Sequence, residues 1–468
     1  MLRPLATQSL ATGESLCFSW IDSTLKKLPD GHVQMTPAGR HAFESVNEKQ
    51  LHLQNTLISM NIGLYTLTSP LHDENAVNAS SAEFVGQIED SLGYQFDFCG
   101  PDFTTYGSHN LDVIYVRTGG TEGLFEEVFP SLKGNILLLT SGKSNSLAAS
   151  MEILSYLRQK GRKGEIIHGN VKYIAQRLSL LNKVNAARQT LQGQNLGIIG
   201  QPSDWLISSN SDKAKVNETL GINLVDIDIE ELIKIINSDK NLSSYLPENA
   251  AELAAKVPVG IQKYTDGALR IYCALKKIIE KYSLSGLTLR CFDLLTTVQN
   301  TGCLALAMLN AEGIPSGCEG DVPTLMTMAI GKTITGQCGF QANPSRIDPQ
   351  TGEMLLAHCT VPFDMIRNFS FNTHFESGIG LAVHGELPEG DATIAKFSGD
   401  LSRHFFCKTT LTGNPYEKSL CRTQIMMKIE HNSSEVCRDY FLKSPIGNHH
   451  VVFTGDQTNL FEAFIESL

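Results

Sequence analysis

The sequence predicts an α/β protein in which two doubly wound parallel-sheet (Rossmann-like) modules are followed by a C-terminal antiparallel β-barrel-like domain. Over the first two-thirds of the chain, short apolar runs alternate with helical patterns, which is typical of parallel sheets covered by helices. Beyond about residue 340 the helical pattern fades, and short strands separated by Gly, Asn and Pro replace it. The last third of the chain is therefore expected to have a different architecture.

The first module is predicted from apolar runs that end at Gly- or Ser-rich turns. Strands are expected at residues 62–67, 111–116 and 135–140. Helices are expected at 82–92, where Ser80 and Ser81 supply a capping signal, and at 147–160. Strands followed by helices in this way build a parallel sheet.

The second module repeats the pattern, and the C-terminal region departs from it. Strands are expected at 195–200 and 222–227, and helices at 229–237 and 260–282. The expected C-terminal strands are short and punctuated by glycine: 354–360, 378–383, 392–398, 405–410 and 424–429. We divide the chain into an N-terminal module at 1–165, a second module at 166–315 and a C-terminal domain at 316–468.

The composition fits a protein of several domains that works in the cytoplasm. A chain of 468 residues is too long for one core, and its net charge of −11 argues against binding nucleic acid or anionic membranes. No apolar stretch approaches the roughly 20 residues of a membrane span, and the N-terminus lacks the apolar core of a signal peptide. The 11 cysteines form no Cys-x-x-Cys pair, which favours a reducing compartment.

Three short signatures suggest a metal site. They are Cys-Glu-Gly-Asp at 318–321, Ala-His-Cys-Thr at 357–360 and Gly-Asn-His-His at 447–450. The carboxylate of Glu319 and the imidazoles of His358 and His449 could together hold one divalent ion. Asp321 is explained as the N-cap of the helix that follows, but capping does not explain Glu319.

Each signature also has a purely structural explanation. Glu319 alone would be a solvated loop carboxylate, and Gly-Asn-His-His could be a loop–strand junction with surface histidines. His449 and His450 are neighbours on one strand and face opposite sides, so only one of them can enter a shared site. For the same reason Cys359 is not expected to act together with His358, and a buried, unreactive thiol is the simpler interpretation.

These residues, in this order, resemble the motifs of the L-fucose isomerase and L-arabinose isomerase superfamily. The motif matches lie within residues 260–468, and the rest of the chain is similar only in architecture. In both families a glutamate stands in a Glu-x-Asp turn before a long apolar helix, as Glu319 does here. His358 resembles a histidine ligand of the arabinose enzymes. His449 resembles the last ligand, which lies in an Asn-His strand near the C-terminus.

One position departs from the family pattern. Where the family has a second carboxylate, this chain has Asn343. An amide can bind a hard metal through its carbonyl oxygen, but it cannot take up a proton as a carboxylate does. Asp293, just after a predicted strand, is the first candidate to replace the acid, although it could equally be a strand-end turn residue. Asp348, Glu353 and a metal-bound hydroxide are the other candidates.

The resemblance implies a metal-dependent aldose–ketose isomerase that acts on a pentose or hexose through an enediolate. Mn²⁺ or another divalent ion is expected, because carboxylate, amide and imidazole ligands together suit a borderline-hard ion. Together, the predicted site residues are, for the metal, Glu319, Asn343, His358 and His449; for catalysis, Glu319 and Asp293; and for the substrate, Arg290, Asn448 and His450.

The resemblance also implies a homo-oligomer, a trimer or a hexamer, that binds a small sugar. Because of Asn343, two alternatives to the isomerase stay open. One is a related carbohydrate-active enzyme, such as an epimerase or lyase, and the other is a non-catalytic sugar-binding protein.

Overall fold

The computed structural model describes residues 25–27, 33–35, 61–247, 250–429 and 435–468. The chain forms two compact units. The large unit contains residues 1–49 and 190–461, and the small unit contains residues 50–189 and 462–468. The division into three domains at 1–165, 166–315 and 316–468 stays a prediction.

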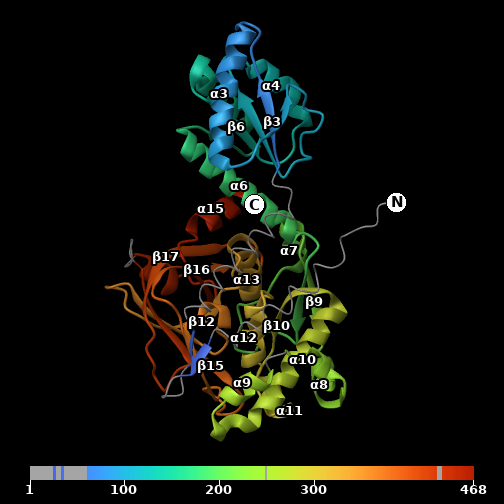
Figure 1. Cartoon of the computed structure of the whole chain (residues 1–468), viewed down its shortest axis with the longest axis vertical. Helices are drawn as coiled ribbons and strands as arrows, with labels where there is room; N and C mark the ends of the chain where they lie inside the picture. The colour runs from blue at the N-terminus through green and yellow to red at the C-terminus, as the bar shows by residue number, and fades with distance from the viewer. Residues whose placement is uncertain (1–24, 28–32, 36–60, 248–249, 430–434) are drawn as a thin grey trace. The chain divides into compact units, whose positions relative to one another are not determined.

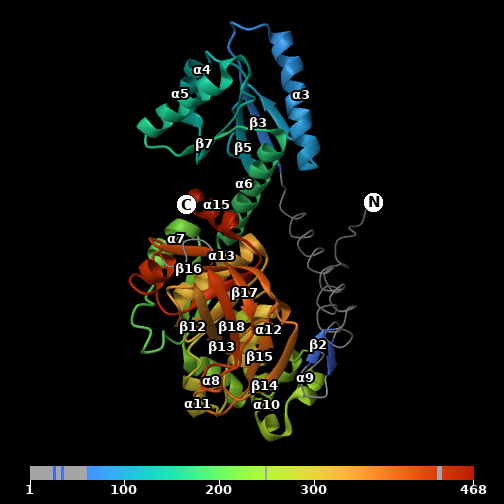
Figure 2. The same ribbon diagram turned by 90° about the vertical axis from the view of Figure 1, so that its left-hand side faces the viewer.

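The small unit is built on a parallel sheet of five strands in the order β4-β3-β5-β6-β7. These strands are β3 (Ile62–Leu67), β4 (Asp97–Gly100), β5 (Leu111–Val116), β6 (Ile136–Leu139) and β7 (Gly164–Ile167). The helices of this part of the chain are α3 (Glu74–Leu92), α4 (Glu122–Val128), α5 (Ser146–Gln159) and α6 (Val171–Leu191). Figure 2 shows α3 on one side of the sheet and α4 and α5 on the other.

Two apolar clusters, one on each face, hold this sheet. Leu64 packs with Ile88 and Ile174 on one face, and Tyr65 packs with Phe125 on the other. Neighbouring residues of β3 thus point into different cores, as alternation along a strand requires. Burial on both faces explains the almost unbroken apolar runs and confirms the predicted doubly wound architecture.

Helix α3 begins earlier than the sequence predicted. We placed its start after Ser80 and Ser81, but both residues lie inside a helix that begins at Glu74. Asp73 is the N-cap, and its side chain accepts a hydrogen bond from the amide of Ala76. Asp and Ser cap helices about equally well, so the longer helix is explained by the additional turns of backbone hydrogen bonds that residues 74–81 contribute.

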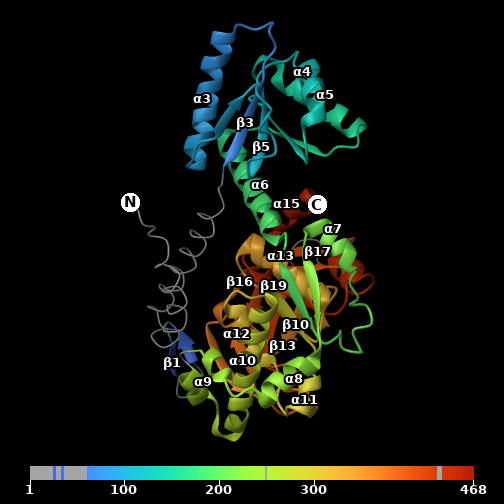
Figure 3. The same cartoon turned by 90° about the vertical axis from the view of Figure 1, so that its right-hand side faces the viewer.

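The large unit contains the second parallel sheet, with the strand order β11-β10-β8-β9. Its strands are β8 (Asn195–Ile199), β9 (Asn223–Ile227), β10 (Leu284–Leu289) and β11 (Ser316–Cys318). The helices between and after them are α7 (Lys213–Leu220), α8 (Ile229–Ser238), α9 (Ala250–Lys256), α10 (Thr265–Tyr282), α11 (Asp293–Thr297), α12 (Cys303–Ala311) and α13 (Val322–Thr335). Helix α10 packs against β8 and β10. Its position beside β10 can be followed in Figures 1 and 3.

A closed barrel of six antiparallel strands completes the large unit, in the order β12-β13-β18-β17-β16-β19. The strands are β12 (Phe340–Ile347), β13 (Glu353–His358), β16 (Gly390–Phe397), β17 (His404–Gly413), β18 (Thr423–Ile429) and β19 (His450–Thr454). Closure leaves no strand edge unpaired, and it confirms the predicted antiparallel barrel.

A smaller antiparallel sheet has the order β1-β2-β14-β15. Its strands are β1 (Leu25–Lys27), β2 (Val33–Met35), β14 (Asn368–Asn372) and β15 (Ala382–Glu386). The strand predicted at 378–383 begins later, at Ala382. Gly378 and Gly380 both have positive φ angles, so the backbone before Ala382 cannot be extended.

Helix α15 (Thr458–Ser467) follows the barrel. None of the helices in the described ranges is long and apolar enough to cross a membrane.

Candidate metal centre

Glu319 lies in a tight turn at the carboxyl end of β11. It has a φ angle of 64°, and Gly320 next to it has a φ of 71°. A Cβ at Gly320 would overlap the carbonyl oxygen of Gln201, so only glycine fits there. The left-handed conformation is uncommon for a glutamate, and residues held in it cluster at functional sites. The turn aims the Glu319 side chain into the large unit, where it is mostly buried.

Two histidines of the barrel point toward this carboxylate. His358 is the last residue of β13, and its Nε2 lies 3.9 Å from Oε1 of Glu319. His449 directly precedes β19, and its Nε2 lies 3.6 Å from the same oxygen. Strand β12 separates β13 from β19 in the barrel, so barrel closure brings the two imidazoles together. The sequence prediction that these three residues converge is thereby matched in their geometry.

Each imidazole is oriented by a partner on its other nitrogen. Nδ1 of His358 lies 3.0 Å from Oγ1 of Thr360, and Nδ1 of His449 lies 2.9 Å from Oδ2 of Asp321. A carboxylate can only accept, so Nδ1 of His449 carries a proton and donates it to Asp321. Histidines that bind metals are commonly held in this way, with the other nitrogen left for the ion.

The three donor groups fit a divalent metal. Their ligand atoms all lie within 4.8 Å of one another. Nε2 of His449 is buried and has no hydrogen-bond partner within the described part of the chain, although buried polar atoms are normally paired. A cation between Nε2 and the Glu319 carboxylate would satisfy both groups, so this cluster is compatible with a divalent ion.

The charges of the cluster are strongly coupled. Burial would raise the pKa of Glu319, but the nearby imidazoles of His358 and His449 hold that pKa well below its usual range. Burial lowers the pKa of His449, but Asp321 and Glu319 outweigh burial and raise it to about 9. A proton or a metal ion can therefore bind between Nε2 of His449 and the Glu319 carboxylate, and the two compete for this position.

Asp321 connects the site to the barrel interior. As predicted, it is the N-cap of α13 and accepts a hydrogen bond from the Thr324 amide. It is fully buried, as is Lys396, whose Nζ lies 3.4 Å from Oδ2 of Asp321. Burial would raise the pKa of Asp321, but Lys396 and His449 keep it well below its usual range. The sequence predicted the cap but not the lysine or the histidine contact.

Trp205 is a site residue that the sequence reasoning missed. Its Nε1 donates a hydrogen bond of 2.7 Å to Oε2 of Glu319, and its ring packs edge-on against Phe292. Trp205 lies in the loop after β8, at the same sheet edge as Glu319. Functional side chains gather at the carboxyl ends of parallel strands, and that rule would have pointed to this loop.

Arg290 and Asp293 lie together beyond β10. Nε of Arg290 donates to Oδ1 of Asp293 at 3.1 Å, and its other nitrogens donate to Asp204 and to the carbonyl of Pro202. Arg290 thus ties the loop after β8 to the end of β10. Neither residue belongs to the three-donor cluster. Their assignments to substrate binding and catalysis stay predictions.

Of the remaining predicted residues, Asn343 lies on β12, His450 begins β19, and Asn448 lies in the turn just before β19. Nδ2 of Asn448 donates a 3.0 Å hydrogen bond to Oδ1 of Asn343. His450 is buried, and its Nε2 lies 2.8 Å from the Tyr440 hydroxyl, so the neighbouring histidines have separate partners. Burial and the nearby Lys396 lower the pKa of His450 to about 3. The roles of Asn343, Asn448 and His450 stay predictions.

Comparison with known proteins gives two relatives, both named sulfoquinovose isomerase. The relative from Clostridium sp. (strain MSTE9) is 30% identical over 149 residues, which cover 30% of this chain and 32% of the relative. The relative from Alkalicoccus urumqiensis is 22% identical over 262 residues, which cover 53% of this chain and 58% of the relative. The chain is similar to sugar isomerases. The matches span about a third and about three-fifths of the relatives' own lengths, and no family model matches the sequence.

Proposed function

We propose that the chain is a metal-dependent aldose–ketose isomerase that acts on a pentose or hexose. The observation that supports this most directly is the convergence of the Glu319 carboxylate with Nε2 of His358 and of His449. The similarity to proteins named sulfoquinovose isomerase supports the same class of reaction. Carboxylate and imidazole ligands suit Mn²⁺, which we propose as the ion.

Glu319, His358 and His449 would hold the ion, with Asn343 as a further ligand. A divalent ion supplies Lewis-acid chemistry, because it polarises a carbonyl oxygen. Asp321 would keep the His449 ring in place through Nδ1. Trp205 fixes one oxygen of Glu319, so the other stays directed at the two imidazoles.

The proton transfer between neighbouring sugar carbons requires an acid–base group, and we propose Glu319 and Asp293. Glu319 would bind the ion through its carboxylate, which leaves it less free to carry a proton and favours Asp293 as the proton carrier. Glu353 begins β13 and His358 ends it. Five residues of extended strand span about 16 Å, so Glu353 is too far along the strand to replace the missing carboxylate.

A sulfonated hexose is the first substrate to test, because both relatives are named for sulfoquinovose. L-Fucose and L-arabinose follow from the motif resemblance. Arg290, Asn448 and His450 are the proposed sugar contacts, and a homo-oligomer, trimeric or hexameric, is the proposed assembly.

Turnover of sulfoquinovose, L-fucose and L-arabinose by the purified chain with Mn²⁺ tests the proposal. We expect a ketose product from at least one of them. Glu319→Gln should lower the rate by about 10²-fold or more, with an unchanged far-UV circular dichroism spectrum. Glu389→Gln is the matched control, because Glu389 is an exposed carboxylate in the turn before β16.

The possible outcomes separate the alternatives. Near wild-type ketose formation by Glu319→Gln would contradict the assigned site. An epimer or a cleavage product in place of the ketose would identify a different enzyme class on the same scaffold. Sugar binding that is insensitive to chelators, without turnover, would indicate a sugar-binding protein.

A further inference from the structure

A row of three residues crosses the sheet of the small unit. In the strand register, Gly63 of β3 lies beside Asp97 of β4 on one side and beside Asp112 of β5 on the other. Registered neighbours point to the same face, so two carboxylates flank a position that has no side chain. Cys99 lies two residues after Asp97 on β4 and shares that face.

His109 occupies the space that Gly63 leaves open. A Cβ at position 63 would overlap Nδ1 of this imidazole. The same nitrogen lies 2.7 Å from Oδ1 of Asp112 and 3.3 Å from the hydroxyl of Tyr65. The His109 side chain is 5% exposed, so its ring is held firmly in the sheet surface. Since a carboxylate only accepts, Nδ1 donates to Asp112, and in the neutral ring Nε2 is the nitrogen left to bind a cation.

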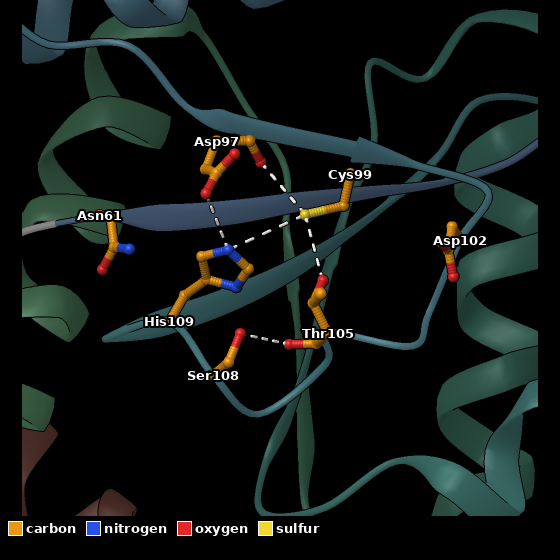
Figure 4. Close-up of a pocket in the computed structure, with 7 residues that line it drawn as sticks. All are labelled: Asn61, Asp97, Cys99, Asp102, Thr105, Ser108 and His109. Carbon is orange, nitrogen blue, oxygen red and sulfur yellow. Dashed lines mark hydrogen bonds and ion pairs between the residues drawn. The ribbon is translucent and has the colours of Figure 1, made fainter.

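Nε2 of His109 faces two further donor groups. It lies 3.1 Å from Oδ2 of Asp97 and 3.9 Å from Sγ of Cys99, and Figure 4 shows the three side chains pointing toward one another. A neutral ring would place the Nε2 lone pair against this carboxylate oxygen, so the contact requires either a proton on Nε2 or a cation between the two atoms. The ligand atoms of all three residues lie within 4.8 Å of one another.

The spacing agrees with a zinc-type ion. In a tetrahedral zinc site with bonds of about 2.0–2.3 Å, neighbouring ligand atoms lie about 3.3–3.6 Å apart. The two distances from Nε2 bracket that range. The three residues line a cavity of about 420 Å³ together with Asn61, Asp102, Thr105 and Ser108, which leaves room for a fourth ligand.

We propose that Asp97, Cys99 and His109 form a second metal site, distinct from the Glu319 centre, that binds a zinc-type divalent ion. A thiolate, an imidazole and a carboxylate are a donor set that zinc prefers over Mg²⁺ or Ca²⁺. Asp112 positions the His109 ring, and Gly63 makes room for it, so both act through the histidine. The competing interpretation is a Cys99 nucleophile that uses His109 as its base.

Titration of the full-length chain with Co²⁺ tests the proposal. A thiolate ligand gives Co²⁺ a charge-transfer absorption that carboxylate and imidazole ligands do not, so the signal distinguishes this site from the Glu319 centre. We expect the band in the wild type and in Glu319→Gln, and its loss in Cys99→Ser. Cys407→Ser, which removes another partly exposed thiol, should keep the band.

Asp112→Asn and Gly63→Ala give a second, independent measurement. Each should weaken Co²⁺ binding by about 10–100-fold without removing any ligand atom. Zn²⁺ should also slow the alkylation of Cys99 by iodoacetamide. A band that persists in Cys99→Ser, or no band in the wild type, would overturn the proposal. Fast alkylation that Zn²⁺ does not slow would overturn it in favour of the nucleophile.

Discussion

Replacement of Asp321 by Asn would keep the shape of a buried side chain and remove its charge. The amide oxygen can still accept the Thr324 hydrogen bond, and Asn caps helices as well as Asp does. Lys396, only 1% exposed, would lose the carboxylate that lies 3.4 Å away. Removal of one partner of a buried ion pair costs about 3–5 kcal/mol.

We expect Asp321→Asn to fall near the lower end of that range, about 3 kcal/mol. Burial already lowers the pKa of Lys396, and Asp321 only partly offsets this. Without the carboxylate, the lysine can release its proton, which limits the energetic penalty of burial. Urea unfolding followed by far-UV circular dichroism, in the presence of a chelator, measures the free energy of unfolding.

Two further variants make the prediction specific. Asp212→Asn should change the free energy of unfolding by only a few tenths of a kcal/mol, because Asp212 caps α7 in the same way but is exposed. Asp321→Asn combined with Lys396→Met should recover most of the loss, since neither charge remains buried. The free energy of unfolding that each single variant loses can be added and compared with the loss in the double variant. If the double variant loses as much as this sum, the two charges are not coupled and the reasoning is refuted.

Three other outcomes are expected. The apparent Mn²⁺ affinity at the Glu319 centre should rise with pH by up to about tenfold per pH unit and level off near pH 9. The reason is that the ion must displace the proton of His449, whose pKa is raised to about 9. Calorimetric titration measures this affinity, and a value that stays constant from pH 6 to 9 would contradict the prediction. Burial raises the pKa of Asp364 to about 7, above its unfolded value, so its protonated form stabilises the fold at low pH and that stability is lost as the pH rises toward 7. Asp364→Asn should therefore stabilise the protein by about 2–4 kcal/mol at pH 8 and by almost nothing at pH 3.5, as urea unfolding at the two pH values would show. Trp205→Phe removes a hydrogen bond to the charged oxygen of Glu319, and such a bond is worth about 1.5–3 kcal/mol. This variant should therefore lower the Mn²⁺ affinity or kcat by about 10–100-fold. Trp205→His keeps a ring N–H and should lower the affinity or kcat by less.

The three candidate ligands could be selected from the sequence because each lies in a recognisable local pattern. Glu319 precedes a capped helix, and His358 and His449 lie at strand ends. Their partners could not be found in this way. Lys396 lies 75 residues from Asp321, and Trp205 lies 114 residues from Glu319.

Such distant pairs depend on tertiary structure rather than on local pattern. The closed barrel determines which residue of β16 lies beside α13, and the parallel sheet determines which loops share an edge. Alternating strands and helices, in contrast, follow from periodicity along the chain. The start of α3 at Glu74 shows that even local boundaries are ambiguous where several residues could cap the helix.

The candidate ligands come from two different sheets of one unit. Glu319 follows the parallel sheet, whereas His358 and His449 belong to the barrel. An ion bound by all three residues would cross-link the two sheets. The complete set of ligands would form only after both sheets had folded and packed against each other. The ion would then bind with full affinity only to the completely folded unit. The free energy of unfolding would increase with the logarithm of the free ion concentration. The free energy of unfolding would thus depend on the free ion concentration, apart from any effect of the ion on catalysis.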